Sequence, residues 1–531
     1  MSQSSCPWWL TAASAAVLVL VSSACRTTQG LTASVSQPVH PVLIGNEHNI
    51  LFRIVIDSKQ NTPVPLESLD VSLAGSSNPA ADIEALELIH TGAKLEFDPA
   101  GARFGKTAAP APKLSFRGQQ QLHPGANVFW LSARLSPRAD LSNKVAASAG
   151  LFGVNGGSLT VANQPPAVRR RIGIALRKHN DGGVHTHRIA SLATGPQGTL
   201  YSVYDLRRRK SRDLQEDIDI GLSRSIDGGN TWEPPRVIMD MGEYGNKPQE
   251  ENGVSDPGIV VDQQTGEIFV FAVWMWGKPG KHQWTGDGSE AGYEIGKSAQ
   301  LMLVRSRDNG LTWTKPENLT RKLKKEAWWL LAPAPNQGIN LPDGTLVLPA
   351  QGRDEKGETF ATIMTSRNHG ASWSVGTPAF SGGNECQAAQ LGDGSIMLNI
   401  RNDHERFRAV FVTNDLGRSW QAHPTNRNTL IEPNCNASLC RFDLKGGGPV
   451  GHILLFANPQ SQQARTHHTL QVSFDDGRTW PKANHLLLDE GRGRGYPSIS
   501  RIDDTHIGIV YEGSRADLTF ERISISELLR R

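Results

Sequence analysis

Cysteine, net charge and long apolar runs are all scarce in this chain of 531 residues. Five cysteines at this length exclude a scaffold built on disulfides. A formal net charge of +3 is no nucleic-acid signature, and the basic runs 169–171 and 207–210 are too short to create one. The 53 glycines and 31 prolines instead indicate many turns between short strands, so we expect an all-β fold.

The first residues have the pattern of an export signal. Trp8–Val21 is an apolar run of 14 residues, too short for a membrane-spanning helix and typical of a signal-peptide core. Small residues and then Cys25 follow it, so we expect a signal peptide over 1–24 and an exported bacterial protein. Both a periplasmic or secreted protein and a surface lipoprotein tethered through Cys25 fit this pattern. After this run no segment has the length and apolarity of a membrane span.

Two regions of different sequence pattern follow the predicted signal peptide. Residues 31–165 contain short β-segments such as 50–56 and 128–135 between loops rich in Gly, Pro, Ala and Ser. This pattern predicts an N-terminal domain resembling a small β-sandwich. Residues 168–531 differ because an internal repeat runs through them.

The repeat has the form S-x-D-x-G-x-T-W. Full copies begin at Ser225, Ser306 and Ser473, and looser copies begin at Ser366 and Thr413. The acidic residue accepts backbone N–H groups, Gly takes a positive φ and Trp packs on the strands, so each copy predicts a hairpin turn. The tryptophans of successive copies lie 47 to 81 residues apart, about one four-stranded sheet. Five copies predict a six-bladed β-propeller in which one blade lacks the motif.

A second, ordered set of residues is interleaved with the repeats. It comprises His187-Arg188-Ile189-Ala190, Arg207, Asp213, Asp256, Glu385, Arg401, Arg465, Tyr496-Pro497-Ser498 and Glu512. The repeats resemble the Asp boxes of bacterial sialidases. Over residues 168–531 the order and spacing of the set resemble the exo-α-sialidases (neuraminidases) of glycoside hydrolase family 33. One departure is Ala190, which stands where that family has Pro.

The resemblance implies a site for a sugar that carries a carboxylate on its anomeric carbon. Guanidinium groups from three separate blades are expected to hold this carboxylate, and they belong to Arg188, Arg401 and Arg465. Glu512 is expected to position Arg188. The positions that match sugar contacts are Arg207 and Asp256, and one of three tryptophans is expected to wall the N-acyl pocket: Trp274, Trp276 or Trp284.

The same resemblance assigns the reacting groups. A carboxylate nucleophile would be repelled by the sugar's own carboxylate, and sialidases use a tyrosine instead. Tyr496 is the expected nucleophile, and Glu385 is expected to take its proton. Asp213 is the expected general acid and base. It lies in an acidic cluster, so Asp217 is an alternative.

These assignments predict a hydrolase that releases terminal α-linked sialic acid from glycoproteins, glycolipids or oligosaccharides with retention of configuration. A trans-sialidase or intramolecular trans-sialidase would use the same residues, and a sialic-acid-binding propeller without turnover would not need Tyr496 or Asp213. No cofactor and no metal is expected, because the histidine pairs 185/187 and 467/468 lack carboxylates at ligand spacing. Cys435 and Cys440 either pair after export or stay free.

Overall fold

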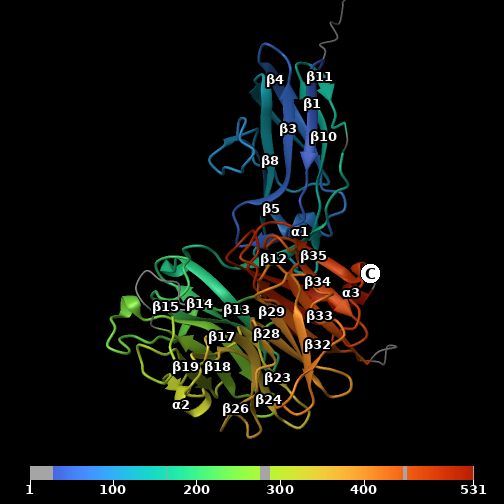
Figure 1. Cartoon of the computed structure of the whole chain (residues 1–531). Coiled ribbons are helices and arrows are strands. Elements are labelled where there is room, and N and C mark those ends of the chain that lie inside the picture. The colour runs from blue at the N-terminus through green and yellow to red at the C-terminus, as the bar shows by residue number, and fades with distance from the viewer. Residues whose placement is uncertain (1–27, 163, 276–287, 446–450, 530–531) are drawn as a thin grey trace, which may run out of the picture.

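The computed structural model describes residues 28–162, 164–275, 288–445 and 451–529. These residues form an almost entirely β structure in which an elongated N-terminal domain stands on one side of a propeller (Figure 1). The short helices of the described part are α1 (Pro79–Asp82), α2 (Thr320–Leu323) and α3 (Ile525–Leu529), with 3₁₀ turns at Asp181–Gly183, Gln249–Glu251 and Lys482–Asn484. None of these helices is long and apolar enough to cross a membrane. The predicted signal segment, Cys25 included, lies outside the described residues.

The N-terminal domain consists of two antiparallel sheets packed face to face. One sheet has the order β1 (Leu31–Ser36), β3 (Asn49–Ser58), β8 (Gly125–Leu135), β5 (Ile83–His90), β6 (Ala102–Arg103). The other has the order β11 (Gly157–Leu159), β10 (Ser148–Val154), β4 (Val64–Ser72), β7 (Lys113–Leu122). The segments expected as strands at 50–56 and 128–135 lie in β3 and β8, which pair with each other. This arrangement confirms the predicted sandwich.

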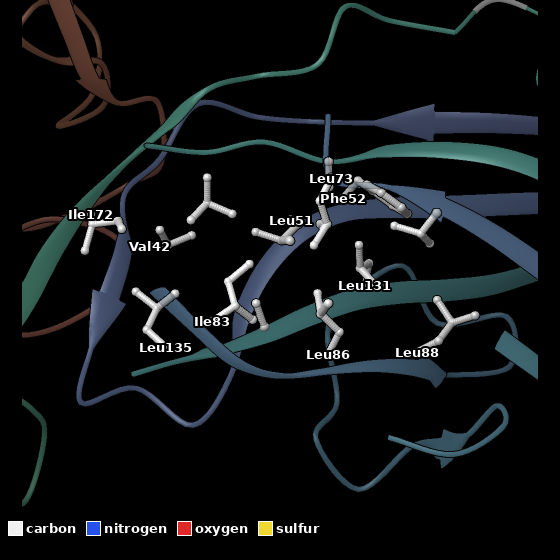
Figure 2. Close-up of a cluster of buried hydrophobic side chains, with 14 of the residues drawn as sticks. Val42, Leu51, Phe52, Leu73, Ile83, Leu86, Leu88, Leu131, Leu135 and Ile172 are labelled. Atoms are coloured by element: carbon white, nitrogen blue, oxygen red, sulfur yellow. The ribbon is translucent and has the colours of Figure 1, made fainter. Parts of the chain in front are cut away.

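The core of this domain comes from strand alternation. Alternate residues of β8, such as Phe129, Leu131 and Ala133, point inward and are fully buried. Figure 2 shows Leu131 with Leu86 and other apolar side chains of the same cluster. The cluster continues through Val42 and Ile172, so one core joins the N-terminal domain to the propeller (Figure 2).

The remaining six sheets form the blades of the propeller. The first blade contains β13 (Thr186–Thr194), β14 (Leu200–Arg207), β15 (Ile218–Ser225) and β16 (Arg236–Met239). The second contains β17 (Val254–Val261), β18 (Ile268–Trp274), β19 (Gln300–Ser306), β20 (Glu317–Asn318) and β22 (Asn336–Gln337). The third contains β21 (Leu330–Pro333), β23 (Ile339–Asn340), β24 (Leu346–Arg353), β25 (Thr359–Ser366), β26 (Ser374–Val375) and β27 (Phe380–Ser381).

The chain continues with three further blades. The fourth contains β28 (Gly383–Gln390), β29 (Ile396–Asn402), β30 (Ala409–Thr413) and β31 (Gln421–Ala422). The fifth contains β32 (Ser438–Asp443), β33 (His452–Pro459), β34 (His468–Ser473) and β35 (His485–Asp489). The sixth contains β36 (Pro497–Arg501), β37 (His506–Tyr511), β38 (Leu518–Ser524) and β12 (Arg170–Arg177). The predicted count of six blades is confirmed.

The sixth blade closes the ring, because its outer strand β12 precedes the first blade in sequence. The N-terminal domain adds two short strands to β12: β2 (Val42–Ile44) in parallel and β9 (Lys144–Val145) antiparallel. Arg171 of β12 donates to Glu521 at 2.7 Å and to Glu527 at 2.6 Å. The N-terminal domain is therefore hydrogen-bonded into the blade that also carries Tyr496.

The repeats form the turn that ends the third strand of each of the first five blades. In the first copy Asp227 accepts hydrogen bonds from Ser225 Oγ at 2.8 Å and from the Thr231 amide at 2.9 Å. Asn368 keeps the same contacts in the loosest copy, from Ser366 Oγ at 3.0 Å and the Ser372 amide at 2.9 Å. These bonds are all local, as the motif predicts.

Candidate active site

A cavity of about 280 Å³ lies at the end of the propeller where the inner strands begin. All six blades contribute to its wall. Seven of the predicted residues line it: Arg188, Asp213, Asp256, Glu385, Arg401, Arg465 and Tyr496. A larger cavity of about 710 Å³ is lined by Thr194, Gln390 and Arg501, where the same inner strands end. None of the predicted residues that the structure describes lines the larger cavity, so the smaller one is the candidate site.

The inner strands bulge where they meet the cavity. The strand register shifts between Arg188 and Ser191 in β13, between Ser255 and Gly258 in β17, and between Gly383 and Cys386 in β28. Ile189 and Asp256 have φ values of 58° and 59°, which for residues other than glycine cost about 1–3 kcal/mol each. Their amides are held by carboxylates, Ile189 by Glu512 at 2.7 Å and Asp256 by Asp205 at 3.2 Å. The bulges turn side chains from the strand face into the cavity.

Arg188 is fixed by a carboxylate from the sixth blade. Its Nε and Nη2 each donate to one oxygen of Glu512 at 3.0 Å, a bidentate pair. Burial alone would lower the pKa of Arg188, but Glu512 and Asp213 outweigh it and raise that pKa. Arg188 is therefore a permanent cation with a defined orientation. Glu512 does not line the cavity and acts on the site through Arg188, as its predicted positioning role requires.

The other two predicted arginines share a partner that the sequence did not reveal. Arg401 Nε donates to Asn434 Oδ1 at 2.5 Å, and Arg465 Nη2 donates to the Asn434 carbonyl at 3.1 Å. Arg465 also donates to the Arg494 carbonyl at 2.8 Å. The guanidinium carbons of Arg188 and Arg465 lie 5.3 and 5.5 Å from the centre of the Tyr496 ring. Three guanidinium groups thus surround Tyr496, from the first, fourth and fifth blades.

Tyr496 and Glu385 are joined by a short hydrogen bond at the centre of the site. The Tyr496 hydroxyl donates to Glu385 Oε1 at 2.5 Å and accepts from Arg401 Nη1 at 3.0 Å. Arg401 also donates to Glu385 Oε2 at 2.6 Å. Burial and the Glu385 charge raise the pKa of Tyr496 well above its ordinary value, and Arg401 and Arg465 offset only part of this. At rest Tyr496 is therefore a neutral phenol whose proton already points at a carboxylate.

Asp213, not Asp217, lies at the cavity. Asp213 pairs with Arg207 Nη1 at 2.5 Å and lies 3.6 Å from Arg188 Nη1. Its side chain is 30% exposed, so a ligand in the cavity can reach it. Asp217 does not line the cavity and accepts from Gln249 at 3.2 Å. The structure therefore favours the predicted residue over its alternative.

Two predicted sugar contacts are placed differently. Arg207 is fully buried and pairs with Asp205 at 2.9 Å as well as with Asp213. It supports Asp213 from behind and does not line the cavity. Trp274 is also fully buried, where its Nε1 donates to Asn252 at 2.8 Å and its ring packs on Tyr244. The wall predicted at Trp274 is not formed by that residue, and Trp276 and Trp284 lie outside the described residues.

Asp256 lines the cavity in an environment that favours its protonated form. Burial and the neighbouring carboxylates of Glu385, Asp205 and Asp213 raise the pKa of Asp256 well above its ordinary range, and Arg207 offsets only part of this. Its oxygens meet Ser255 Oγ at 3.2 Å and Gln351 Nε2 at 3.4 Å. A protonated Asp256 can donate a hydrogen bond to a sugar oxygen.

The described cysteines form no disulfide. Cys435 and Cys440 are both buried and free, so the alternative of a disulfide between them is not realised here. Cys435 packs against Ile189 and Tyr496 as a small apolar side chain. In the described part of the chain, no three His, Cys, Asp or Glu side chains are grouped to hold a metal ion. Site residues without any sequence motif are Asn434, Gln351 and Arg353.

Fold and site together are those of a glycoside hydrolase built on a β-propeller. Residues 31–158 match the family described as the N-terminal domain of BNR-repeat neuraminidase, and residues 198–509 match the BNR repeat-like domain. A sialidase of Bacteroides fragilis is 35% identical over 92% of this chain and 94% of its own length. The chain therefore belongs to the BNR-repeat neuraminidases, or sialidases.

Solved structures agree with this family. The Hadza microbial sialidase Hz136 has a TM-score of 0.86 and 35% identity, covering 93% of this chain and 99% of that one. The intramolecular trans-sialidase from Ruminococcus gnavus, solved with oseltamivir carboxylate, has a TM-score of 0.52 and 16% identity. It covers 67% of this chain and 98% of that one, and at this identity it shows the fold alone.

Proposed function

We propose that this protein is an exo-α-sialidase that hydrolyses terminal α-linked sialic acid from glycoconjugates, with retention of configuration and with Tyr496 as nucleophile. The observation that carries the proposal is the 2.5 Å hydrogen bond from the Tyr496 hydroxyl to Glu385, enclosed by three arginines. A pure binding protein has no need of a buried phenol aimed at a carboxylate. The names of the similar proteins support the same substrate class.

In the first step the sugar carboxylate lies against Arg188, Arg401 and Arg465, next to the reacting carbon. Tyr496 forms a bond to the anomeric carbon while its proton passes to Glu385. The bond from that carbon to the departing oxygen breaks, and Asp213 gives this oxygen a proton. The product is a covalent aryl glycoside, in which the Tyr496 oxygen is bonded to the anomeric carbon of the sugar, together with the released alcohol.

Asp213 must carry a proton for this step, and substrate binding favours that state. At rest Arg207 and Arg188 stabilise its carboxylate at 2.5 and 3.6 Å. The substrate's carboxylate competes for Arg188 and brings a second negative charge close to Asp213. A nearby like charge disfavours the ionised form of a carboxyl group, so binding of the substrate promotes protonation of the acid.

In the second step water attacks the same carbon and gives a proton to Asp213, while the bond to Tyr496 breaks. Glu385 returns the proton to the phenolate, so both carboxyl groups recover their starting states. Two displacements at one carbon leave its configuration unchanged. A sialidase that transfers its sugar would differ only in the hydroxyl that attacks here.

The first-formed product tests this proposal. Proton NMR of an aryl α-sialoside digest should show the α-anomer of free sialic acid before it equilibrates to β. A 2,7-anhydro product would assign the intramolecular transfer, and sialylated acceptor in the presence of lactose would assign a trans-sialidase. An initial β-anomer would refute retention. Absence of turnover together with binding of the sialoside would identify a non-catalytic sialic-acid-binding protein.

We further propose that the protein acts after export, on sialylated glycans outside the cytoplasm, and that Cys25 begins the mature chain. The support is the apolar run Trp8–Val21 followed by small residues. N-terminal sequencing of protein from a bacterial host should find residues 1–24 removed. Retention of Met1 in exported protein would contradict the proposal, and loss of membrane association in Cys25→Ser would identify a lipid anchor.

A further inference from the structure

A fourth arginine lines the cavity, and its contacts differ from those of the other three. Arg353 ends β24 in the third blade and is 5% exposed. Its strand neighbours across the sheet are Leu330 and Thr359, which also line the cavity. Unlike Arg188, Arg401 and Arg465, none of its guanidinium donors meets an acceptor among the residues that the structure describes.

The carboxylate whose charge acts on Arg353 is already engaged with other partners. Asp403 stabilises the Arg353 cation through space, but it makes no ion pair with it within the described chain. Its oxygens accept instead from Asn384 Nδ2 at 2.9 Å and from Thr359 Oγ1 at 2.8 Å. Burial of a guanidinium group without acceptors destabilises the fold, so a cavity-facing arginine of this kind is poised for a ligand.

The order of the blades places Arg353 across the ring from Tyr496. Tyr496 and Glu512 belong to the sixth blade, and in a ring of six the third blade faces the sixth. A sialic acid whose carboxylate is bound by Arg188, Arg401 and Arg465 would fill the rest of this cavity, whose wall includes Asp256 and Arg353. The groups that reach this far wall are the acylamino group on C5 and the three-carbon polyol on C6. Both carry neutral oxygen acceptors.

We propose that Arg353 is a substrate-binding residue that donates hydrogen bonds to a neutral oxygen of the sugar's far substituents, either the polyol on C6 or the acyl carbonyl on C5. The inference rests on the proposed function. Asp256, protonated and adjacent in the second blade, supplies a second donor on the same wall. Arg353 thereby helps to determine which sialic acids the site accepts.

The test compares three aryl α-sialosides on wild type, Arg353→Met and Arg353→Lys. One substrate is complete, one has its polyol shortened to a single carbon by periodate and borohydride, and one carries a hydroxyl in place of the acylamino group. In the wild type, one of the altered substrates should lose roughly 10- to 100-fold in kcat/KM, the range expected for a hydrogen bond to a charged donor. Arg353→Met should lose a similar factor on the complete substrate and show no further loss on that altered one. The altered substrate whose loss in kcat/KM disappears in Arg353→Met identifies the sugar oxygen that Arg353 binds.

Several outcomes would overturn the assignment. If each altered substrate loses the same factor in kcat/KM in Arg353→Met as it does in the wild type, Arg353 does not touch the sugar. Because the side chain has no acceptor among the described residues, Arg353→Met should keep or raise the midpoint of thermal unfolding, and a large fall in the Met and Lys variants alike would show a structural role. If turnover is too slow in a folded variant, the same ratios are measured as Kd values of the three free sugars. An inactive wild type would refute the proposed function instead.

Discussion

Replacing Glu512 with Gln removes one negative charge from the wall behind the candidate site while keeping the shape of the side chain. Glu512 is 1% exposed and accepts four hydrogen bonds: two from Arg188 and one each from the amides of Ile189 and Tyr496. A Gln side chain offers one oxygen and one NH₂ group. Whichever way it turns, the NH₂ group meets donors that previously faced an oxygen.

The expected cost follows from this geometry. Removing one partner of a buried ion pair typically destabilises a protein by about 3–5 kcal/mol. For a propeller of roughly 360 residues that unfolds as one unit, this lowers Tm by about 4–7 °C. Arg188 loses its bidentate anchor, so we also expect kcat/KM on an aryl α-sialoside to fall by at least ~100-fold, because a misplaced binding group weakens transition-state contacts.

The matched control is Glu527→Gln. Glu527 accepts from Arg171 at 2.6 Å and from Lys144 at 2.5 Å, but its side chain is 22% exposed and lies at the domain junction. This variant should lose less stability and keep kcat/KM within about twofold, since its contacts end at the surface. Thermal unfolding and steady-state kinetics of both variants separate a loss of positioning from a loss of stability. Wild-type kcat/KM in Glu512→Gln would refute the positioning role, and an equal kinetic loss in Glu527→Gln would show that stability alone explains it.

Three further predictions address single residues. Arg465→Ala should weaken binding of a sialic-acid analogue by at least about 2 kcal/mol, roughly 30-fold in Kd, since a charge-assisted partner of the carboxylate is lost; an unchanged calorimetric Kd would mean that Arg465 does not meet the ligand. Asp213→Ala should lower kcat/KM on natural sialosides by ~10²–10⁴-fold and on an activated aryl sialoside by less, because a phenolate leaves without a proton; equal losses would argue against a general acid. The pKa of Asp256 is raised in the folded protein, so its protonated form stabilises the fold. This stabilisation is fully present below the pKa of Asp256 in the unfolded chain, about 4, and is lost as the pH rises toward the higher pKa of the folded protein. Urea midpoints of Asp256→Asn should therefore fall less with rising pH than those of wild type, and parallel profiles would contradict a protonated Asp256.

The propeller was predictable because the signal for it is local. Each Asp box satisfies its own turn within a few residues, as Ser306 and Asp308 do at 2.9 Å, so the sequence pattern needs no knowledge of distant contacts. The pairing of β2 and β9 with β12 carries no such signal. Those short strands join the sixth blade through contacts between segments that are far apart in the sequence, within the core that the two domains share.

The site residues divide in the same way. The residues that match family motifs, such as Arg401 and Tyr496, lie together in one cavity. Arg207 was expected to contact the sugar, but the buried Asp205 beside it needs a cation, and this ion pair keeps Arg207 behind the wall. Trp274 ends the apolar run of β18, every residue of which is buried, so its ring belongs to the core. Asn434 and Arg353 have no motif, because tertiary packing alone brings them to the site.

The proposed mechanism depends on attack of Tyr496 on the anomeric carbon. A 2,3-difluorosialic acid loses its C2 fluoride and forms a slowly hydrolysed bond to the nucleophile of a retaining enzyme, so peptide mass spectrometry of the inactivated protein locates that residue. We expect one added 3-fluorosialyl group on Tyr496 in the wild type. We also expect none in Tyr496→Phe, which keeps the ring and the fold while kcat falls by orders of magnitude. Label on Glu385 or Asp213, or an unlabelled wild type that still turns over the probe, would contradict this mechanism.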